Sequence, residues 1–373
     1  MKAIFIVLVL IFTTLVINYN CQQLQGYFKI YSGKKAIQKS TINIQVCALK
    51  CLKTENCIMA VGNDQNCTIL DECSTNDYNE TNFSLIKKIN KDDKEDSNFT
   101  LKMTLINHSE WIFSLAVLNN GDLASGSADR TIKIWNFDTG CEIMSLNGHI
   151  QIVRSLAVLQ NGDLASGSSD MTIKIWNTNN GIVKMTLNGH SDAVISLAVL
   201  KNGDLASGSA DETIKIWNTN VGNVKITLNG HSGWIYSLVV LNNGDLASGS
   251  SDMTIRIWNT NNGIVKMTLN GHSGAVISLA VLNNGDLASG SADRTIKIWN
   301  LDNGDEIMSL NGHIQIVRSL AVLKNGDLAS GSYDKTIKIW NTNNGFVKMT
   351  LNGHSDALMS LALKNLKKKC FTN

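Results

Sequence analysis

The sequence lacks several features that would direct a search for function. Its 373 residues contain no proline, for which we find no structural reason, and the abundance of Asn, Lys and Ile points to a compositional bias of the genome. The formal net charge is only +2, so neither nucleic acid nor an acidic substrate is an expected partner. No histidine precedes His108, and no glycine-rich phosphate loop follows a predicted strand, so no metal or cofactor is expected.

The one strongly apolar run, residues 3–17, comes directly after Met1 and Lys2. A membrane-spanning helix needs about 20 apolar residues, whereas a shorter run behind a basic start is typical of a signal peptide. Residues 18–20 lack the small side chains of a cleavage site. Residues 1–20 are therefore predicted to be a signal peptide or an uncleaved signal anchor. We expect a secreted protein, with anchoring through residues 3–17 as the alternative and a cytoplasmic location less favoured.

Six of the eight cysteines lie within residues 21–73. Behind a signal peptide, such a cluster is typical of three disulfides in a small domain, and the absence of paired C-x-x-C spacings disfavours zinc. The stretch CALKCLKTENCIMAVGNDQNCTIL resembles the apple/PAN domain. That resemblance implies an α+β module over residues 21–86 that binds proteins or carbohydrates outside cells. It also implies the disulfides Cys51–Cys57, Cys47–Cys67 and Cys21–Cys73. Cys141 and Cys370 have no evident partners.

Five N-glycosylation sequons precede the first complete repeat, at Asn66, Asn79, Asn82, Asn98 and Asn107. Each is weak evidence alone in a chain rich in asparagine, but their position beside the cysteines agrees with secretion. Residues 87–100 are mostly charged or polar and lack apolar periodicity, which predicts a solvated linker.

Beyond residue 100 the chain repeats itself, and successive histidines such as His108 and His149 are 41 residues apart. One copy reads HSGAVISLAVLNNGDLASGSADRTIKIW. VISLAVL alternates like a half-buried strand, and LASGS and TIKIW predict two more. The Asn284-Gly285 pair predicts a tight hairpin with a type I′ turn. A fourth strand, EIMSL, precedes the next Gly-His. Four strands repeated at this period predict stacked blades arranged in a ring.

At these residues the chain resembles the WD-repeat β-propeller family, over residues 101–363, with a basic tail at 364–373. The resemblance implies a mainly β fold of six complete four-stranded blades and a partial seventh. It also implies a buried, hydrogen-bonded tetrad in each complete blade. Asn replaces the family's usual Asp after each tetrad tryptophan, a position outside the tetrad. The implied tetrads are His108, Ser125, Asp129 and Trp135; His149, Ser166, Asp170 and Trp176; His190, Ser207, Asp211 and Trp217; His231, Ser248, Asp252 and Trp258; His272, Ser289, Asp293 and Trp299; and His313, Ser330, Asp334 and Trp340.

The two ends of the repeat region differ from its middle. Residues 101–106 match the fourth-strand segment of the repeat, so we expect the chain to enter on an outer strand. A seventh copy begins at His354 but departs from the pattern at Leu363, which leaves its middle two strands without a counterpart. We favour an incomplete seventh blade in a truncated or frameshifted gene model over a six-blade ring with an external tail. The last blade's face is then uncovered, and a homodimer through this blade follows as an expectation.

No residue set in the repeat stands apart as catalytic. The tetrad histidines each have their own Ser, Asp and Trp, which favours a structural role over metal binding. We therefore predict a non-enzymatic interaction protein; the alternatives are an intracellular scaffold with a misread N-terminus and a propeller enzyme acting on glycans. The basic residues of the TIKIW strands are expected to pair with nearby carboxylates. They are Lys133, Lys174, Lys215, Arg256, Lys297 and Lys338.

Residues that break the repeat symmetry indicate a binding surface. Most lie at the third and fifth positions after each blade's histidine, and the only tryptophans outside the tetrads are Trp111 and Trp234. Tyr333 instead precedes a tetrad aspartate, where the other five blades have a small residue. Trp, Tyr and Arg dominate interface hot spots because they bury large rigid areas with a polar group. The alternative is ordinary packing between blades. We expect other proteins, or glycans, to bind a rim made of Trp111, Phe113, Arg154, Trp234, Tyr236, Arg318 and Tyr333, with the cysteine-rich module adding a second contact.

Overall fold

The computed structural model describes the backbone of residues 98–364 without a break, together with short strands earlier in the chain. Side chains are described for most residues from Thr104 to Leu363. Every helix or strand in these residues is a β-strand. The described part of the chain contains no helix that is long and apolar enough to cross a membrane.

Residues Thr14–Asn79 form a unit of their own. Its described residues make two small antiparallel pairs, β2 (Tyr31–Ser32) with β3 (Lys35–Ala36) and β4 (Ala60–Val61) with β5 (Cys67–Thr68). The side chains of the six N-terminal cysteines lie outside the described residues, so the three implied disulfides and the apple/PAN resemblance remain predictions. The same holds for the side chains of Asn66, Asn79, Asn82 and Asn98.

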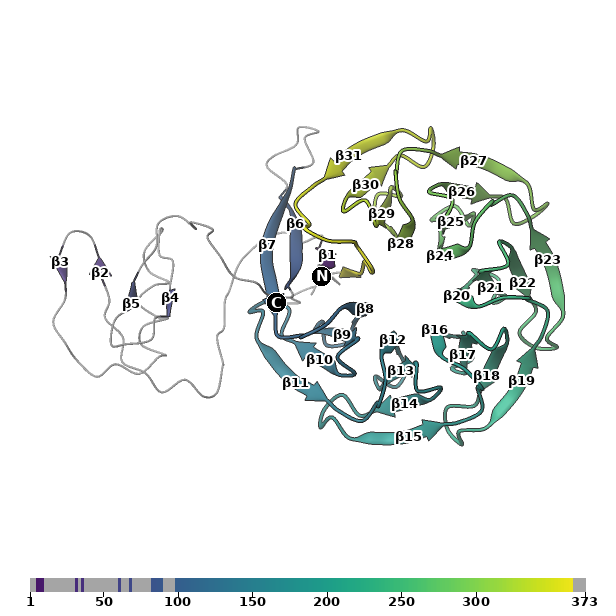
Figure 1. Cartoon of the computed structure of the whole chain (residues 1–373), viewed down its shortest axis with the longest axis horizontal. Helices are drawn as coiled ribbons and strands as arrows, with labels where there is room; N and C mark the ends of the chain where they lie inside the picture. The colour runs from purple at the N-terminus through teal and green to yellow at the C-terminus, as the bar shows by residue number, and fades with distance from the viewer. Residues whose placement is uncertain are drawn as a thin grey trace, which may run out of the picture. The chain divides into compact units, whose positions relative to one another are not determined.

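Six four-stranded antiparallel sheets follow one another around a ring (Figure 1). Consecutive strands are neighbours in each sheet, so every blade is a simple meander from the centre outward. The innermost strands are β8 (Ile112–Val117), β12 (Val153–Val158), β16 (Val194–Val199), β20 (Ile235–Val240), β24 (Val276–Val281) and β28 (Val317–Val322). The second strands are β9 (Leu123–Ser127), β13 (Leu164–Ser168), β17 (Leu205–Ser209), β21 (Leu246–Ser250), β25 (Leu287–Ser291) and β29 (Leu328–Ser332).

The two outer strands of each blade carry the TIKIW and EIMSL-type segments. The third strands are β10 (Ile132–Trp135), β14 (Ile173–Trp176), β18 (Ile214–Trp217), β22 (Ile255–Trp258), β26 (Ile296–Trp299) and β30 (Ile337–Trp340). The outermost are β11 (Glu142–Leu146), β15 (Val183–Leu187), β19 (Val224–Leu228), β23 (Val265–Leu269), β27 (Glu306–Leu310) and β31 (Val347–Leu351). The predicted mainly β fold with six complete four-stranded blades is therefore confirmed.

The first hairpin of each blade is tight, but its turn type differs from the prediction. The N–H of Gly285 donates to the carbonyl of Leu282 at 3.0 Å, and the N–H of Leu282 donates to the carbonyl of Asp286 at 2.8 Å. Gly285 has a φ of 97°, whereas Asn284 has no positive φ. A type I′ turn needs positive φ at both central residues, so that prediction is wrong. The loop has three residues rather than two, and it is a type I turn closed by a left-handed glycine.

The hydrophobic core lies between neighbouring blades. Between the first and second blades, Ile132 and Ile134 pack against Val153, Leu164 and Trp176. Equivalent residues meet at the following junctions. Each fully buried aliphatic side chain contributes roughly 1.5–3 kcal/mol through the removal of its surface from water. A blade cannot bury both of its faces alone, so the stability of the fold resides at these junctions.

A mixed four-stranded sheet, which we call the closing sheet, lies between the sixth and first blades. Its order is β32 (Leu363–Lys364), β1 (Phe5–Val9), β6 (Asn82–Ile89) and β7 (Asn98–Ile106). Strand β6 is antiparallel to β7, whereas β1 is parallel to both β6 and β32. Residues 101–106 thus lie on an outer edge strand, as predicted, but β1 and β6 of the same sheet precede them in the chain. Strand β1 falls within the predicted signal segment, and β6 spans residue 86, where the cysteine-rich module was predicted to end.

The segment after the sixth blade covers that blade's face. Leu358 and Leu361 are buried against Ile337 and Ile339. The expectation that this face is uncovered is therefore wrong, because the partial seventh copy retains the apolar residues of an inner strand. The homodimer inferred from that uncovered face loses its basis.

On its other side, the same segment contacts the start of the repeat region. Met359 joins one buried cluster with Leu105 of β7 and with Ile112 and Leu115 of β8. The ring is closed by apolar packing as well as by the closing sheet. The sequence predicted that the two middle strands of this last sheet would be missing, whereas β1 and β6 occupy their positions.

Candidate functional site

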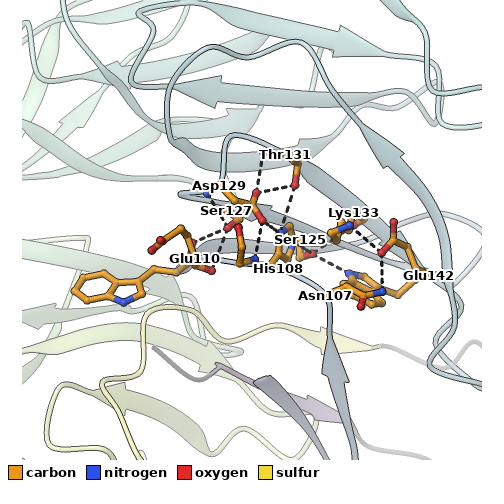
Figure 2. Close-up of polar contacts among 12 residues, drawn as sticks. Asn107, His108, Glu110, Ser125, Ser127, Asp129, Thr131, Lys133 and Glu142 are labelled. Atoms are coloured by element: carbon orange, nitrogen blue, oxygen red, sulfur yellow. Dashed lines mark hydrogen bonds and ion pairs between the residues drawn. The ribbon is translucent and has the colours of Figure 1, made fainter. Parts of the chain in front are cut away.

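Each tetrad forms one directed chain of hydrogen bonds. In the first blade, Trp135 Nε1 donates to Ser125 Oγ at 2.8 Å, and Ser125 Oγ lies 2.7 Å from His108 Nε2. His108 Nδ1 lies 2.7 Å from Asp129 Oδ2 (Figure 2). An indole N–H can only donate, so the serine accepts from tryptophan and donates to the imidazole, which donates in turn to the carboxylate. The same three contacts recur in the other five blades.

A threonine two residues after the aspartate completes this chain. Thr131 Oγ1 donates to Asp129 Oδ1 at 2.6 Å, and the Thr131 N–H donates to the same atom at 2.9 Å (Figure 2). Sequence reasoning missed this residue, although an Asp-x-Thr pattern stands in all six blades. Both carboxylate oxygens are thereby engaged, which leaves little capacity for an external ligand.

Hydrogen bonds within the tetrads favour the ionised form of their aspartates. Burial alone would raise the pKa of the Asp252 carboxyl, but hydrogen bonds from Thr254 and His231 outweigh burial and lower this pKa to about 2. The pKa values of the other five tetrad aspartates are lowered by equivalent bonds against the effect of burial. Burial lowers the pKa of His231, and Asp252 partly offsets that effect. A neutral histidine bound to an ionised aspartate agrees with the directed chain above.

The basic residues of the third strands have two kinds of partner. Lys133 and Lys297 form ion pairs with Glu142 and Glu306, at 2.8 and 2.6 Å. The lysines of three other blades donate instead to threonine hydroxyls of the outermost strands. The Nε of Arg256 is buried without a hydrogen-bond partner. The predicted pairing with carboxylates therefore holds in two blades, where the outermost strand begins with glutamate.

A central channel is lined by the innermost strands and encloses about 180 Å³. Seven serines line it, one for each copy of the repeat. The Oγ of the first six accepts the N–H of a leucine in the next copy at 2.9–3.1 Å, as Ser114 does from Leu156. Sequence reasoning missed these serines, although a polar residue recurs at one position of an apolar alternation. The lining serines are Ser114, Ser155, Ser196, Ser237, Ser278, Ser319 and Ser360.

The residues of the predicted rim occupy three environments. Phe113, Arg154, Tyr236 and Arg318 line the channel. Trp234 is 47% exposed, and its ring centroid lies 6.2 Å from that of Tyr236.

Trp111 and Tyr333 are instead half-buried and pack with Phe113 against the cluster at the closing junction. The centroids of the Trp111 and Phe113 rings are 6.4 Å apart. The structure therefore brings together four of the seven residues in the channel and leaves Trp234 exposed beside them. Trp111 and Tyr333 take part in packing between blades, which was the alternative considered for all seven residues.

The family model for the WD domain, G-beta repeat (WD40), matches six consecutive segments, at residues 99–136, 140–177, 181–218, 222–259, 263–300 and 304–341. The chain is a WD40-repeat protein. Proteins of this family are generally non-enzymatic scaffolds for protein interactions. No curated protein matches the sequence of the chain.

The WD40 segments are staggered against the blades. The first segment begins inside β7, in the closing sheet, and continues through the inner three strands of the first blade. Each later segment likewise joins the outermost strand of one blade to the inner three strands of the next. Each matched segment therefore contributes strands to two neighbouring sheets.

Metal ligands, thiols and sequons can be located among the described residues of this WD40-repeat protein. No group of three His, Cys, Asp or Glu side chains is placed there to hold a metal ion. Cys141 is a free thiol, and Cys370 lies outside the described residues. Asn107, a predicted glycosylation site, is exposed, and its Nδ2 donates to Glu142 Oε2 at 3.0 Å (Figure 2).

Proposed function

We propose that this WD40-repeat protein is an interaction scaffold that holds a protein partner at the mouth of its central channel. The observation that carries the proposal is the exposure of Trp234 beside Tyr236, at a position where two other blades have alanine. An exposed indole next to a second aromatic ring offers a large rigid surface for burial by a partner. The neighbouring arginines supply polar contacts in the same place.

Partner capture by the purified full chain tests this proposal. Trp234→Ala reproduces the residue found at Ala193 and Ala275, so the blade is expected to fold normally. Phe346→Ala is the matched control, because Phe346 is 73% exposed in a loop before an outermost strand. Quantitative mass spectrometry of proteins retained from native extract should show partners that are lost with Trp234→Ala and kept with Phe346→Ala. Equal retention by both variants would contradict the proposal.

We further propose that the protein acts outside the cell, with an apple/PAN-like module as a second contact. The apolar residues 3–17, the six cysteines at 21–73 and the clustered sequons support this location.

An intracellular scaffold is the second candidate, and one observation favours it. Strand β1 (Phe5–Val9) takes part in the closing sheet, and cleavage of a signal peptide would remove it. Peptide mapping of the protein made in a secretory host distinguishes the two. Bridged N-terminal cysteines, glycosylated asparagines and a start near Cys21 support the extracellular location. Free thiols, unmodified asparagines and an intact Met1 support the intracellular one.

A further inference from the structure

Among the described residues that line the central channel, two arginines are the only charged ones. Arg154 and Arg318 come from the second and sixth blades, at the position where Ile195 and Ile277 stand in two others. They are close enough that the charge of Arg318, together with burial, lowers the pKa of Arg154. Like charges in a partly desolvated channel repel each other, and a negative group between them would reverse that effect.

Arg154 is held in place by neutral neighbours. Its Nε donates to Ser169 Oγ at 2.6 Å, and its guanidinium carbon lies 5.4 Å from the centre of the Phe113 ring. These contacts orient the guanidinium without cancelling its charge. Within the part of the chain that the structure describes, one carboxylate acts on it, that of Asp192, an exposed residue whose Oδ1 accepts the N–H of Ala193 at 2.6 Å.

The guanidinium of Arg318 has fewer hydrogen-bond partners among the described residues than that of Arg154. Within the described part of the chain, no hydrogen bond or ion pair to its guanidinium is found, and its electrostatic neighbours are the phenols of Tyr236 and Tyr333. A guanidinium has five N–H donors and binds carboxylate or phosphate oxygens in pairs. Its desolvation without an acceptor is unfavourable unless a ligand supplies one.

The rest of the lining adds donors rather than negative acceptors. Each serine that accepts a leucine N–H keeps its hydroxyl hydrogen free to donate. The Tyr236 hydroxyl is a further donor. The channel encloses about 180 Å³, which is room enough for an acidic side chain to enter. Several hydroxyl donors around the two arginine side chains suit the binding of an oxyanion.

We propose that the channel mouth binds one oxyanion group, a carboxylate or a phosphate, carried by an acidic side chain of the partner. The inference rests on the proposed function for the identity of the carrier, because Trp234 and Tyr236 would hold the flanking part of the same segment. The oxyanion itself is recognised by Arg154 and Arg318.

Titration calorimetry of the full chain with inorganic phosphate and, separately, with succinate at constant ionic strength tests the site. The expected result is binding of at least one of them by the wild-type protein. Arg318→Ile and Arg154→Ile, which introduce the residue of two other blades, are each expected to weaken binding by about tenfold or more, the usual scale for one charge-assisted contact. Arg318→Lys keeps the charge and should lose less. Arg294→Gln removes an equal charge from an exposed turn and should change nothing.

The outcomes separate this site from the proposed function. Binding of phosphate alone or of succinate alone supports the site and identifies the kind of oxyanion. No binding of either, or equal binding by the two isoleucine variants, overturns it, whatever partners the protein captures through Trp234. Binding that depends on Arg318, with no partner lost in Trp234→Ala, leaves the oxyanion site standing and contradicts the proposed function. Melting temperatures of all variants establish that each is folded.

Discussion

A Cβ atom on Gly208 would lie 2.5 Å from Cγ2 of Ile235 in the next blade. The equivalent glycines at most other junctions are equally crowded, whereas a Cβ on Gly331 would meet its nearest neighbour, Leu358, at an ordinary 3.4 Å. The close approach of blades therefore requires glycine in the middle of the second strand, except where the sixth blade meets the chain's last segment.

Gly208→Ala is expected to destabilise the protein by about 1–3 kcal/mol, the usual cost of overpacking a core. Gly331→Ala should leave stability unchanged or slightly raised, because alanine restricts the unfolded chain. Denaturant unfolding of the two variants compares the same substitution in two environments. Equal losses would show that the glycines are needed for something other than blade spacing.

The seventh histidine, His354, provides a second matched pair. Both of its ring nitrogens are buried without a hydrogen-bond partner among the described residues, whereas His190 contacts Asp211 and Ser207 at 2.7 Å each. His354→Leu should be neutral or stabilising, since it removes an unsatisfied polar group. His190→Leu should cost about 3 kcal/mol or more, because it leaves a carboxylate and a hydroxyl buried without their partner. Thermal unfolding at pH 7 measures both, and a larger loss for His354→Leu would contradict this account.

The pH dependence of stability should also change in His354→Leu. Burial lowers the pKa of His354 from 6.5 to about 4. Between these two values the unfolded chain binds a proton that the folded chain does not, so this residue makes stability fall as pH falls from 6.5 to 4. The wild-type protein should therefore lose more stability across this window than His354→Leu does. Parallel curves for the two proteins would show that His354 titrates normally.

The tetrad aspartates act over a lower pH window. The folded pKa of Asp252 is about 2, below its ordinary value of 3.8. Its ionised form therefore stabilises the fold above pH 4, and this contribution is lost as pH falls towards 2. Asp252→Asn should be less stable than wild type at pH 7, and the difference should shrink as the acid transition is approached. Asp302→Asn, in a loop of the fifth blade, is a control for the loss of charge.

A residue after each tetrad aspartate adopts a left-handed backbone. Met253 has a φ of 68°, and its side chain is 48% exposed. Side chains other than glycine and asparagine are strained there by roughly 1 kcal/mol. Met253→Asn should therefore raise the free energy of unfolding by about 0.5–1 kcal/mol, as a higher melting temperature would show. A lower melting temperature would mean that the methionine side chain makes a stabilising contact.

The blades could be predicted from the sequence because six copies carry the same signals at the same positions. The closing sheet could not, since Phe5–Val9 and Asn82–Ile89 belong to no repeat and Phe5–Val9 pairs with segments far away in the sequence. One clue was present: Phe137 stands where four other blades have threonine, and it is buried at the closing junction. The departure is suggestive rather than decisive in the sequence, because Leu301 replaces the same threonine at an ordinary junction.

The candidate site was predicted in part. The fifth position after each histidine was correctly singled out as variable, but the sequence alone does not say that it faces the channel. That direction follows from the pairing of Val194 with Ser209, with a bulge before Ser196. The bulge shifts the register by one residue, so the alternation of side chains is not the simple one of a regular strand. A bulge depends on hydrogen bonds between strands and leaves no clear mark in residue types.

The stagger between WD40 segments and blades has a consequence for folding. Successive junctions are built from nearly the same residues, so the chain has little energetic means of distinguishing a correct neighbour from an equivalent blade of another molecule. The closing sheet and the packing of Met359 against the first blade join the two ends of the repeat region within one chain. During refolding at high concentration, formation of that sheet competes with the exchange of blades between molecules. Dilution should therefore raise the yield of monomeric rings more strongly than it does for a protein whose modules are all different.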